Sequence, residues 1–208
     1  MDKRKKVQGG LKRLYEEMPP FITKDSIKFI ENNIKDTDNV LEFGAGGSTV
    51  YFAKHAKKVV SFESGGYIVR PRKLPRSVEW YSAVVKFLEQ KKLNNVELYL
   101  LQAYPESGVL YERIINSFPD EYFNWVFIDG ANRKLCLDIT RKKLASGGYM
   151  VIDNYDHIPP PNGVTSMKVL MKYEYIGDCL DEYLKGWESK YFDEEGWAGK
   201  GTVIFKKP

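Results

Sequence analysis

Apolar and polar residues form two repeating patterns along this chain. Short runs rich in Val, Leu, Ile and Phe predict strands, whereas longer stretches with apolar residues three or four positions apart predict helices. The two patterns alternate, which favours a parallel sheet with crossover helices between its strands. The predicted strands cover residues 39–43, 58–62, 96–101, 124–129 and 147–153, and the predicted helices cover 23–34, 48–56, 77–93 (capped by Ser77) and 132–145.

The pattern changes after the fifth predicted strand. A Pro-rich break, "HIPPPNG", precedes a predicted helix over residues 165–184, and two strand-like runs follow within residues 187–207, separated by glycines. Such a pair of runs predicts a hairpin, and an antiparallel hairpin is a common addition to the edge of a parallel sheet. We therefore expect an α/β fold whose sheet is mostly parallel and ends in an antiparallel C-terminal hairpin.

Composition restricts the class of protein. The chain has 208 residues, 43% of them hydrophobic, so it can bury one good core, and we expect a single domain over residues 1–208. Six basic residues lie among the first thirteen and define a basic N-terminal arm, residues 1–20, which we expect to be solvated because no aromatic residue is interleaved with these charges. No apolar stretch reaches the roughly 18 residues of a membrane span, and no secretory signal follows the N-terminus. Cys136 and Cys179 lack metal-ligand or redox spacing, so we expect a cytoplasmic protein that does not contact a membrane.

The segment "NVLEFGAGGSTV" has the features of a ligand-binding turn. Gly44 and Gly46 follow a predicted strand and precede a predicted helix, where glycines let a ligand approach the bare backbone. The dinucleotide fingerprint requires a third glycine where this chain has Thr49, so the pattern is weak evidence for NAD. Glu63 ends the second predicted strand roughly 20 residues later, the place of an acid that accepts hydrogen bonds from a ribose diol. A purely structural turn is the alternative.

With Glu42 ahead of the glycines, "EFGAGG" resembles the first motif of the class I S-adenosylmethionine-dependent methyltransferases. "FNWVFIDGANR" and "LASGGYMVIDN" resemble motifs at the fourth and fifth strands of that family, and the likeness extends over about residues 38–206. The resemblance implies a Rossmann-like, doubly wound, mostly parallel seven-stranded sheet with an antiparallel C-terminal hairpin. It also implies S-adenosylmethionine as cofactor, with Glu42, Gly44, Ala45 and Gly46 around its methionine part, Glu63 at its ribose, and Asp129 beside it.

The resemblance leaves two points open near the second strand. Glu79 in "SVEWY" is a rival to Glu63, because the family often has its strand-two acid close to such a Glu-Trp pair; the strand pattern "KVVSFE" favours Glu63. Residues 64–76 then form an insertion loop that carries Arg70, Arg72, Lys73 and Arg76. This loop is interpreted as a lid, as a basic clamp for an anionic substrate, or as a solvated loop.

Polar residues at the fourth and fifth strand ends suggest the chemistry. Asp129, Asp153 and Asn154 are oxygen ligands of the kind that suits Mg²⁺, and they resemble the ligands of divalent-metal-dependent small-molecule O-methyltransferases. The match is partial, because "GANR" follows Asp129. Without a metal, Asp129 would lie beside the methyl group or the substrate, and His157 would be the general base, unless it is a structural loop histidine. Arg133 would meet a substrate anion or be surface charge.

The function that we expect is methyl transfer from S-adenosylmethionine to a small-molecule or carbohydrate-like acceptor, at oxygen rather than nitrogen. The Asn/Asp-Pro-Pro-Tyr signature of many N-methylating relatives is absent from the sequence, and so is a recognisable RNA-binding module, so nucleic acid is not the expected partner. Two alternatives remain: a catalytically inactive cofactor-binding or structural module of the same fold, and an aminopropyltransferase-like enzyme. A homo-oligomer formed through the edge hairpin is left open.

Overall fold

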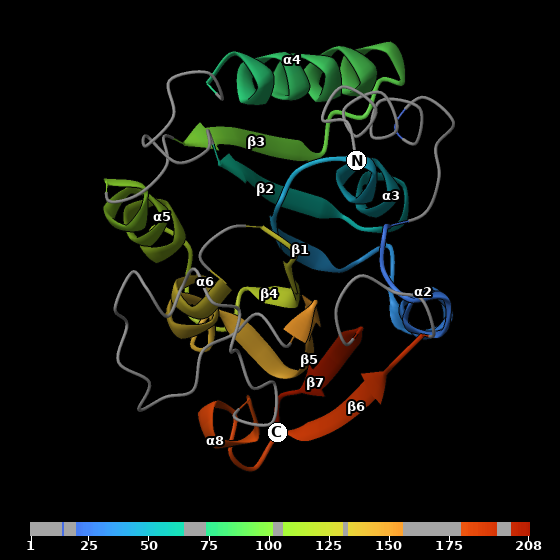
Figure 1. Cartoon of the computed structure of the whole chain (residues 1–208), viewed down its shortest axis with the longest axis vertical. Helices are drawn as coiled ribbons and strands as arrows, with labels where there is room; N and C mark the ends of the chain where they lie inside the picture. Colours follow the sequence, from blue (N-terminus) through green and yellow to red (C-terminus); the bar gives the residue numbers. More distant parts are fainter. Residues whose placement is uncertain are drawn as a thin grey trace.

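The structure, a computed structural model, describes residue 14 and residues 20–64, 74–101, 106–130, 133–155, 180–194 and 201–208. Seven strands form one sheet with the order β3-β2-β1-β4-β5-β7-β6 (Figure 1). The parallel strands are β1 (Asn39–Phe43), β2 (Lys58–Ser64), β3 (Val96–Leu101), β4 (Phe123–Ile128) and β5 (Leu144–Asp153). The antiparallel strands are β6 (Glu188–Phe192) and β7 (Thr202–Lys206), with β7 inserted between β5 and β6. The predicted α/β class, parallel sheet and antiparallel edge are confirmed.

Helices cover both faces of the sheet (Figure 1). One face packs against α2 (Lys24–Asn33), α3 (Gly47–His55) and α4 (Leu74–Gln90), through a core that includes Val40, Val59 and Trp125 of the strands. The other face packs against α5 (Glu106–Asn116), α6 (Arg133–Thr140) and the short α8 (Leu180–Tyr183). Side chains of a strand point alternately to the two faces, so neighbouring residues of β1 serve both cores.

Two helix boundaries differ clearly from the sequence prediction, and one helix is missing from it. Helix α4 begins at Leu74, so Ser77 does not cap it, and the last three residues of the predicted 64–76 insertion belong to this helix. Helix α6 ends at Thr140 rather than at residue 145, because Leu144 already pairs with Phe123 of β4. Helix α5 was not predicted.

Other sequence expectations fall outside the described residues. These are the basic arm except Leu14 and Pro20, the insertion from residue 65 to 73, Cys179, His157, and most of the predicted 165–184 helix. Cys136 is buried in the core beside α5, which agrees with its reading as a small apolar residue. None of the helices in the described part of the chain has the length and apolar character needed to cross a lipid bilayer.

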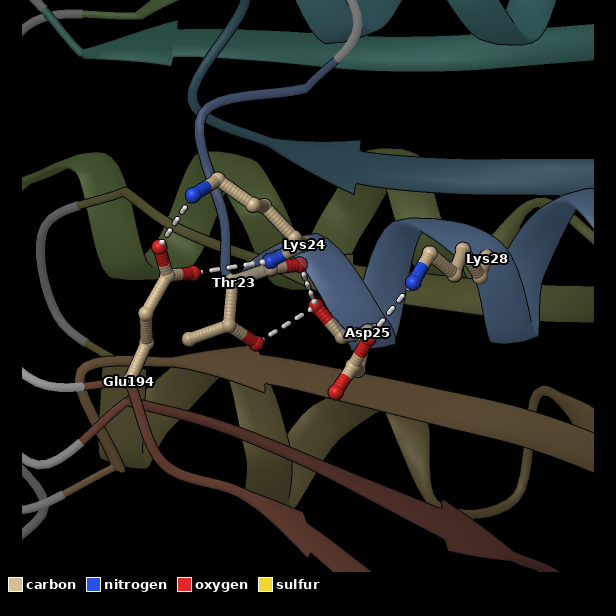
Figure 2. A network of polar contacts seen from close by, with 6 residues as sticks. Thr23, Lys24, Asp25, Lys28 and Glu194 are labelled. Carbon is tan, nitrogen blue, oxygen red and sulfur yellow. Dashed lines mark hydrogen bonds and ion pairs between the residues drawn. The ribbon is translucent and has the colours of Figure 1, made fainter.

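Helix α2 is attached to the far end of the hairpin by a polar network (Figure 2). The Lys24 amide donates to Glu194 Oε2 at 3.0 Å, and the Lys24 ammonium lies 3.2 Å from Glu194 Oε1. Next to them, the buried Thr23 hydroxyl donates to Ser26 Oγ at 2.9 Å. These contacts tie the first described helix to the last two strands, which lie beside it although they are about 170 residues away in sequence.

Candidate functional site: the carboxyl rim of the parallel strands

The glycine loop lies where the order of the sheet reverses. Chain order runs from β1 outward to β2 and β3 on one side, then returns to β4 on the other side of β1. In open parallel sheets, this point leaves a crevice beyond the carboxyl ends of the two central strands, and ligands bind there. Gly44, Ala45 and Gly46 connect the end of β1 to the start of α3 at this place.

The loop is packed so closely that side chains do not fit at its glycines. Gly44 has a φ of 106°, and a Cβ there would meet the backbone of Asp129 and Gly130 at 3.1 Å. A Cβ at Gly46 would lie 3.1 Å from the indole ring of Trp80. The Gly44 and Ala45 amides both donate to the Phe62 carbonyl, at 2.8 and 3.2 Å. Strands β1, β2 and β4 and helix α4 therefore fix the loop together.

Glu42 supports this loop from below. Its side chain is fully buried, and Oε2 accepts short hydrogen bonds from the hydroxyls of Thr49 and Ser61. Thr49 Oγ1 also accepts from the Gly46 amide at 2.8 Å, which links the carboxyl to the start of α3. Burial raises the pKa of Glu42 to about 7, against the opposing effect of the Ser48, Ser61 and Thr49 hydroxyls. Glu42 is therefore joined to the glycine loop through Thr49.

Glu63 stands at the rim beside the loop. It is the last but one residue of β2 and is half-buried. Burial is the main cause that raises its pKa to about 8, followed by the negative charge of Glu42, while a hydrogen bond from the Ala45 backbone opposes the rise and the Asp129 charge adds to it. The loop, Glu63 and Asp129 thus share one electrostatic environment. Glu79, the rival acid, is exposed on α4.

Asp129 and the residues after β5 form the other half of the rim. The Asp129 amide donates to the Phe43 carbonyl at 3.0 Å, and its carboxylate, 31% exposed, pairs with Arg133 at 3.1 Å. Asn154 has a φ of 46°, and its Oδ1 lies 3.5 Å from the same Arg133 nitrogen. Asp153 is buried, with Oδ1 accepting from the Thr202 hydroxyl at 2.8 Å. Burial, and then the Asp129 charge, raise the pKa of Asp153 to about 7.

The predicted magnesium ligands fit a metal poorly in this arrangement. No group of three or more His, Cys, Asp or Glu side chains in the described ranges is placed to hold a metal ion. The Asp129 and Asn154 oxygens face the Arg133 guanidinium instead, and Asp153 Oδ1 bonds to Thr202. We therefore assign no metal-dependent step to these residues.

Sequence reasoning missed several residues of the rim. Thr49 and Ser61 hold Glu42, Trp80 Nε1 donates to the Ala45 carbonyl at 2.7 Å, and Thr202 holds Asp153. Ser61 carried a signal, because it is a polar residue inside the apolar run of β2. Thr202 carried none, because its role depends on the pairing of β7 with β5.

Comparisons with solved structures support the fold. The chain is similar to a Staphylococcus aureus protein assigned as a caffeoyl-CoA O-methyltransferase, with 17% identity, a TM-score of 0.59, and coverage of 97% of this chain and 92% of that one. A Bacillus cereus O-methyltransferase in complex with S-adenosylhomocysteine gives 17% identity, a TM-score of 0.59 and coverage of 99% and 91%. A Geobacter sulfurreducens methyltransferase gives 13% identity, a TM-score of 0.58, and coverage of 100% of this chain and 91% of that one.

No protein-family model matches the chain, and no curated protein matches it. The structural likenesses confirm the Rossmann-like fold that solved S-adenosylmethionine-dependent methyltransferases share, with its antiparallel C-terminal edge. Because the sequence identities are only 13% to 17%, these likenesses show the fold and do not show which reaction the protein catalyses.

Proposed function

We propose that this protein binds S-adenosylmethionine at the carboxyl rim of its sheet and transfers the methyl group to an oxygen of a small-molecule or carbohydrate-like acceptor. The observation that carries the proposal is the closely packed glycine loop at the switch point of the sheet, with Glu63 at the end of the adjacent strand. Similar folds in proteins described as O-methyltransferases, one of them bound to S-adenosylhomocysteine, add support.

The charge of the rim suits this cofactor. Burial is the main cause that raises the pKa of Glu63 to about 8, and repulsion from the negative charges of Glu42 and Asp129 adds to the rise. A ligand with positive charge relieves such repulsion, and S-adenosylmethionine carries a sulfonium and an ammonium group. NAD, with its pyrophosphate, would add negative charge to the same place.

Each residue of the rim has a proposed role. The Glu63 carboxylate accepts hydrogen bonds from the ribose hydroxyls, and the backbone of Gly44, Ala45 and Gly46 contacts the methionine part. Glu42 holds the loop in shape from its buried position. When bound, S-adenosylmethionine supplies an electrophilic methyl group, so the protein has chiefly to align the acceptor oxygen and accept its proton.

The acceptor side is proposed from two residues. Asp129 is partly exposed at the rim next to Gly44, which supports its proposed position beside the cofactor and the reacting oxygen. His157 follows β5 closely in sequence and is our proposed general base; it lies outside the described residues, and the proposal rests on its place in the sequence alone. Mg²⁺ bound by Asp129, Asp153 and Asn154 is the competing way to activate a hydroxyl.

Calorimetric titration with S-adenosylhomocysteine tests the cofactor. We expect micromolar binding, and we expect Glu63→Ala to weaken it by about 1 to 3 kcal/mol, because the ribose hydroxyls lose their acceptor. Glu79→Ala is the matched control: it removes the same carboxylate from the rival position, which is exposed, and should leave the affinity unchanged. Absence of binding to the wild type would reject the proposal and leave a structural module of the same fold.

The reaction products distinguish the two enzyme classes. Methyl transfer leaves S-adenosylhomocysteine, whereas aminopropyl transfer from the decarboxylated cofactor leaves methylthioadenosine. Incubation with a mixture of S-adenosylmethionine and its decarboxylated form and a panel of hydroxylated and amine acceptors is followed by mass spectrometry of the adenosine-containing product. It should yield S-adenosylhomocysteine and a hydroxylated acceptor heavier by one CH₂, about 14 mass units. Methylthioadenosine as the only product would contradict the proposed reaction.

A further inference from the structure

An arginine occupies the centre of the polar group at the β4 and β5 ends. Arg133 is the first residue of α6, one helical turn after Asp129. Its Nη2 lies 3.1 Å from Asp129 Oδ1 and 3.5 Å from Asn154 Oδ1. Two of the three side chains that the sequence pattern assigned to a magnesium ion, Asp129 and Asn154, thus have an oxygen beside a cation that belongs to the chain itself.

The contacts of Arg133 indicate that charge holds it there. Its side chain is only 16% exposed, and its Nε is buried without a hydrogen-bond partner in the part of the chain that the structure describes. A guanidinium that leaves a buried donor unpaired is not held by a full set of hydrogen bonds. Attraction to the Asp129 carboxylate explains the position of the Arg133 guanidinium. The charge of Arg133 also acts on Asp153, where it opposes the rise in pKa that burial causes.

A divalent ion and this guanidinium compete for one place. Magnesium requires near-octahedral oxygen ligands at about 2.0 to 2.1 Å, so Asp129 Oδ1 and Asn154 Oδ1 would have to turn from the guanidinium to the ion. The ion would then lie close to a partly buried positive charge, which opposes its binding. One oxygen of the third side chain is also engaged, because Asp153 Oδ1 accepts a hydrogen bond from Thr202 on β7.

We propose that Arg133 takes the place of the divalent metal in this site, and that methyl transfer by this protein is independent of metal. The statement about methyl transfer rests on the proposed function. The statement that Arg133 excludes a divalent ion depends only on Arg133, Asp129, Asn154 and Asp153. The proposal also specifies the acceptor class. Without a metal to chelate two oxygens, the acceptor presents a single hydroxyl that a protein base deprotonates, and vicinal diols gain no advantage over it.

Binding of Mn²⁺ tests the proposal without an acceptor. Mn²⁺ takes the same oxygen ligands as Mg²⁺ and is followed by the electron paramagnetic resonance signal of the free ion. We expect no saturable binding to the wild type up to about millimolar Mn²⁺, with or without S-adenosylhomocysteine. Arg133→Gln keeps a polar side chain, although a shorter one, and removes the charge, so it should acquire one Mn²⁺ site at least roughly tenfold tighter than any wild-type binding.

Three further variants make the test specific. Arg133→Lys retains the charge and should bind no Mn²⁺, while adding Asp129→Asn to Arg133→Gln should remove the new site. Lys134→Gln is the matched control, because it deletes a positive charge one residue later, where the ammonium pairs with Asp138 at 2.7 Å on the exposed side of α6. It should behave as the wild type.

Two outcomes would overturn the proposal: saturable Mn²⁺ binding to the wild type that Asp129→Asn removes, or no gain of binding in Arg133→Gln. Circular dichroism and thermal unfolding establish that each variant is folded before it is titrated. Calorimetry with S-adenosylhomocysteine on the same samples tests the two proposals separately. If the wild type does not bind S-adenosylhomocysteine, the proposed function is rejected, whereas the Mn²⁺ titrations still test whether Arg133 excludes a divalent ion.

Discussion

Gly44 is a residue whose backbone has two separate reasons to lack a side chain. Its φ of 106° is a conformation that L-residues rarely adopt, and a Cβ would also meet the Asp129 and Gly130 backbone. The contact is between backbones, so no side chain can turn away to make room. A side chain at residue 44 would therefore have to push the end of β1 away from the end of β4.

Gly44→Ala should consequently cost both stability and cofactor binding. We expect the free energy of unfolding to fall by about 1 to 3 kcal/mol, and S-adenosylhomocysteine to bind at least roughly tenfold more weakly, because the loop must shift from Asp129. Chemical denaturation and calorimetry measure the two effects. Gly147→Ala is the control: its φ is 74° but its Cβ position is open, so it should lower stability only and leave binding intact. Equal binding losses in both variants would show that backbone strain alone explains the effect.

The sequence predicted that Glu42 matters, but not how. An acid before a glycine loop resembles a ligand contact, whereas the structure buries it under α3 with Thr49 and Ser61 as its partners. The difference arises from the two-residue period of a strand: Glu42 of β1 and Ser61 of β2 are paired and point to the face that α3 covers. The sequence contains this period, but it does not state which strands are neighbours.

At the scale of elements, Thr202 joins three segments of the fold. Its Oγ1 donates to Asp153 at the end of β5 and accepts from the Thr23 amide ahead of α2 at 3.3 Å. Both contacts are buried, and Thr202 itself begins β7. The ion pair of Lys24 with Glu194 lies beside this junction, with the Lys24 side chain 82% exposed (Figure 2).

Thr202→Val should destabilise the protein far more than loss of that ion pair. Valine keeps the shape but leaves an Asp153 oxygen and the Thr23 N–H without their partner, so we expect a loss of about 1 to 3 kcal/mol. Lys24→Ala removes an exposed pair and should cost no more than about 1 kcal/mol. Urea denaturation of the two variants measures the difference, and a larger loss for Lys24→Ala would contradict this account of the junction.

The order of the strands and helices could be predicted from the sequence more accurately than the residues at which they begin and end. The five parallel strands follow from apolar runs, because burial on both faces leaves few polar residues in such strands. The edge hairpin follows instead from two strand-like runs separated by glycines, since β6 is exposed at four of its five residues. Helix α5 was missed because Val109 and Leu110 are apolar but exposed, next to the buried Tyr111, so the apolar residues of this stretch do not all lie at helical spacing in the sequence. Helix α4 was predicted to begin three residues late, since Ser77 was taken as its cap, whereas the helix begins at Leu74 and has Pro75 in its first turn, where proline is tolerated.

At the scale of the whole molecule, buried acids make stability depend on pH. The pKa of Glu42 rises from 4.5 to about 7, that of Glu63 to about 8, and that of Asp153 from 3.8 to about 7, each mainly by burial. The folded state therefore holds more protons than the unfolded state between about pH 4 and 8. Stability should fall as pH rises through this window, since each carboxyl must lose its proton in a buried place.

Thermal or urea unfolding between pH 5 and 8.5 measures this loss in the protein without ligand. For Glu42 alone, a pKa difference of this size corresponds to about 3 kcal/mol across the window. Glu42→Gln removes the titrating group, so its stability should change less steeply with pH than that of the wild type. Stability that rises with pH over the window would contradict the assignment of raised pKa values to the rim.

The candidate site as a whole was only partly predictable. The sequence predicted one common rim for five residues, because the carboxyl ends of parallel strands share an edge of the sheet. These residues are Glu42, Gly44, Glu63, Asp129 and Asp153. It did not distinguish a metal-binding group from a group already neutralised by Arg133, since that depends on how α6 leaves β4 and directs its first side chain. Arg133 could be interpreted in the sequence as surface charge or as a substrate contact, and its actual partners come from two strands.

The position of β7 has a consequence for the way the protein is made. β7 is the last described strand to leave the ribosome, yet it lies inside the sheet, between β5 and β6. A nascent chain that has already paired its five parallel strands still lacks the Thr202 hydroxyl for Asp153. The rim is thus completed only when β7 emerges, so a ligand that needs the finished rim recognises chains that contain β7 and does not recognise chains truncated before it.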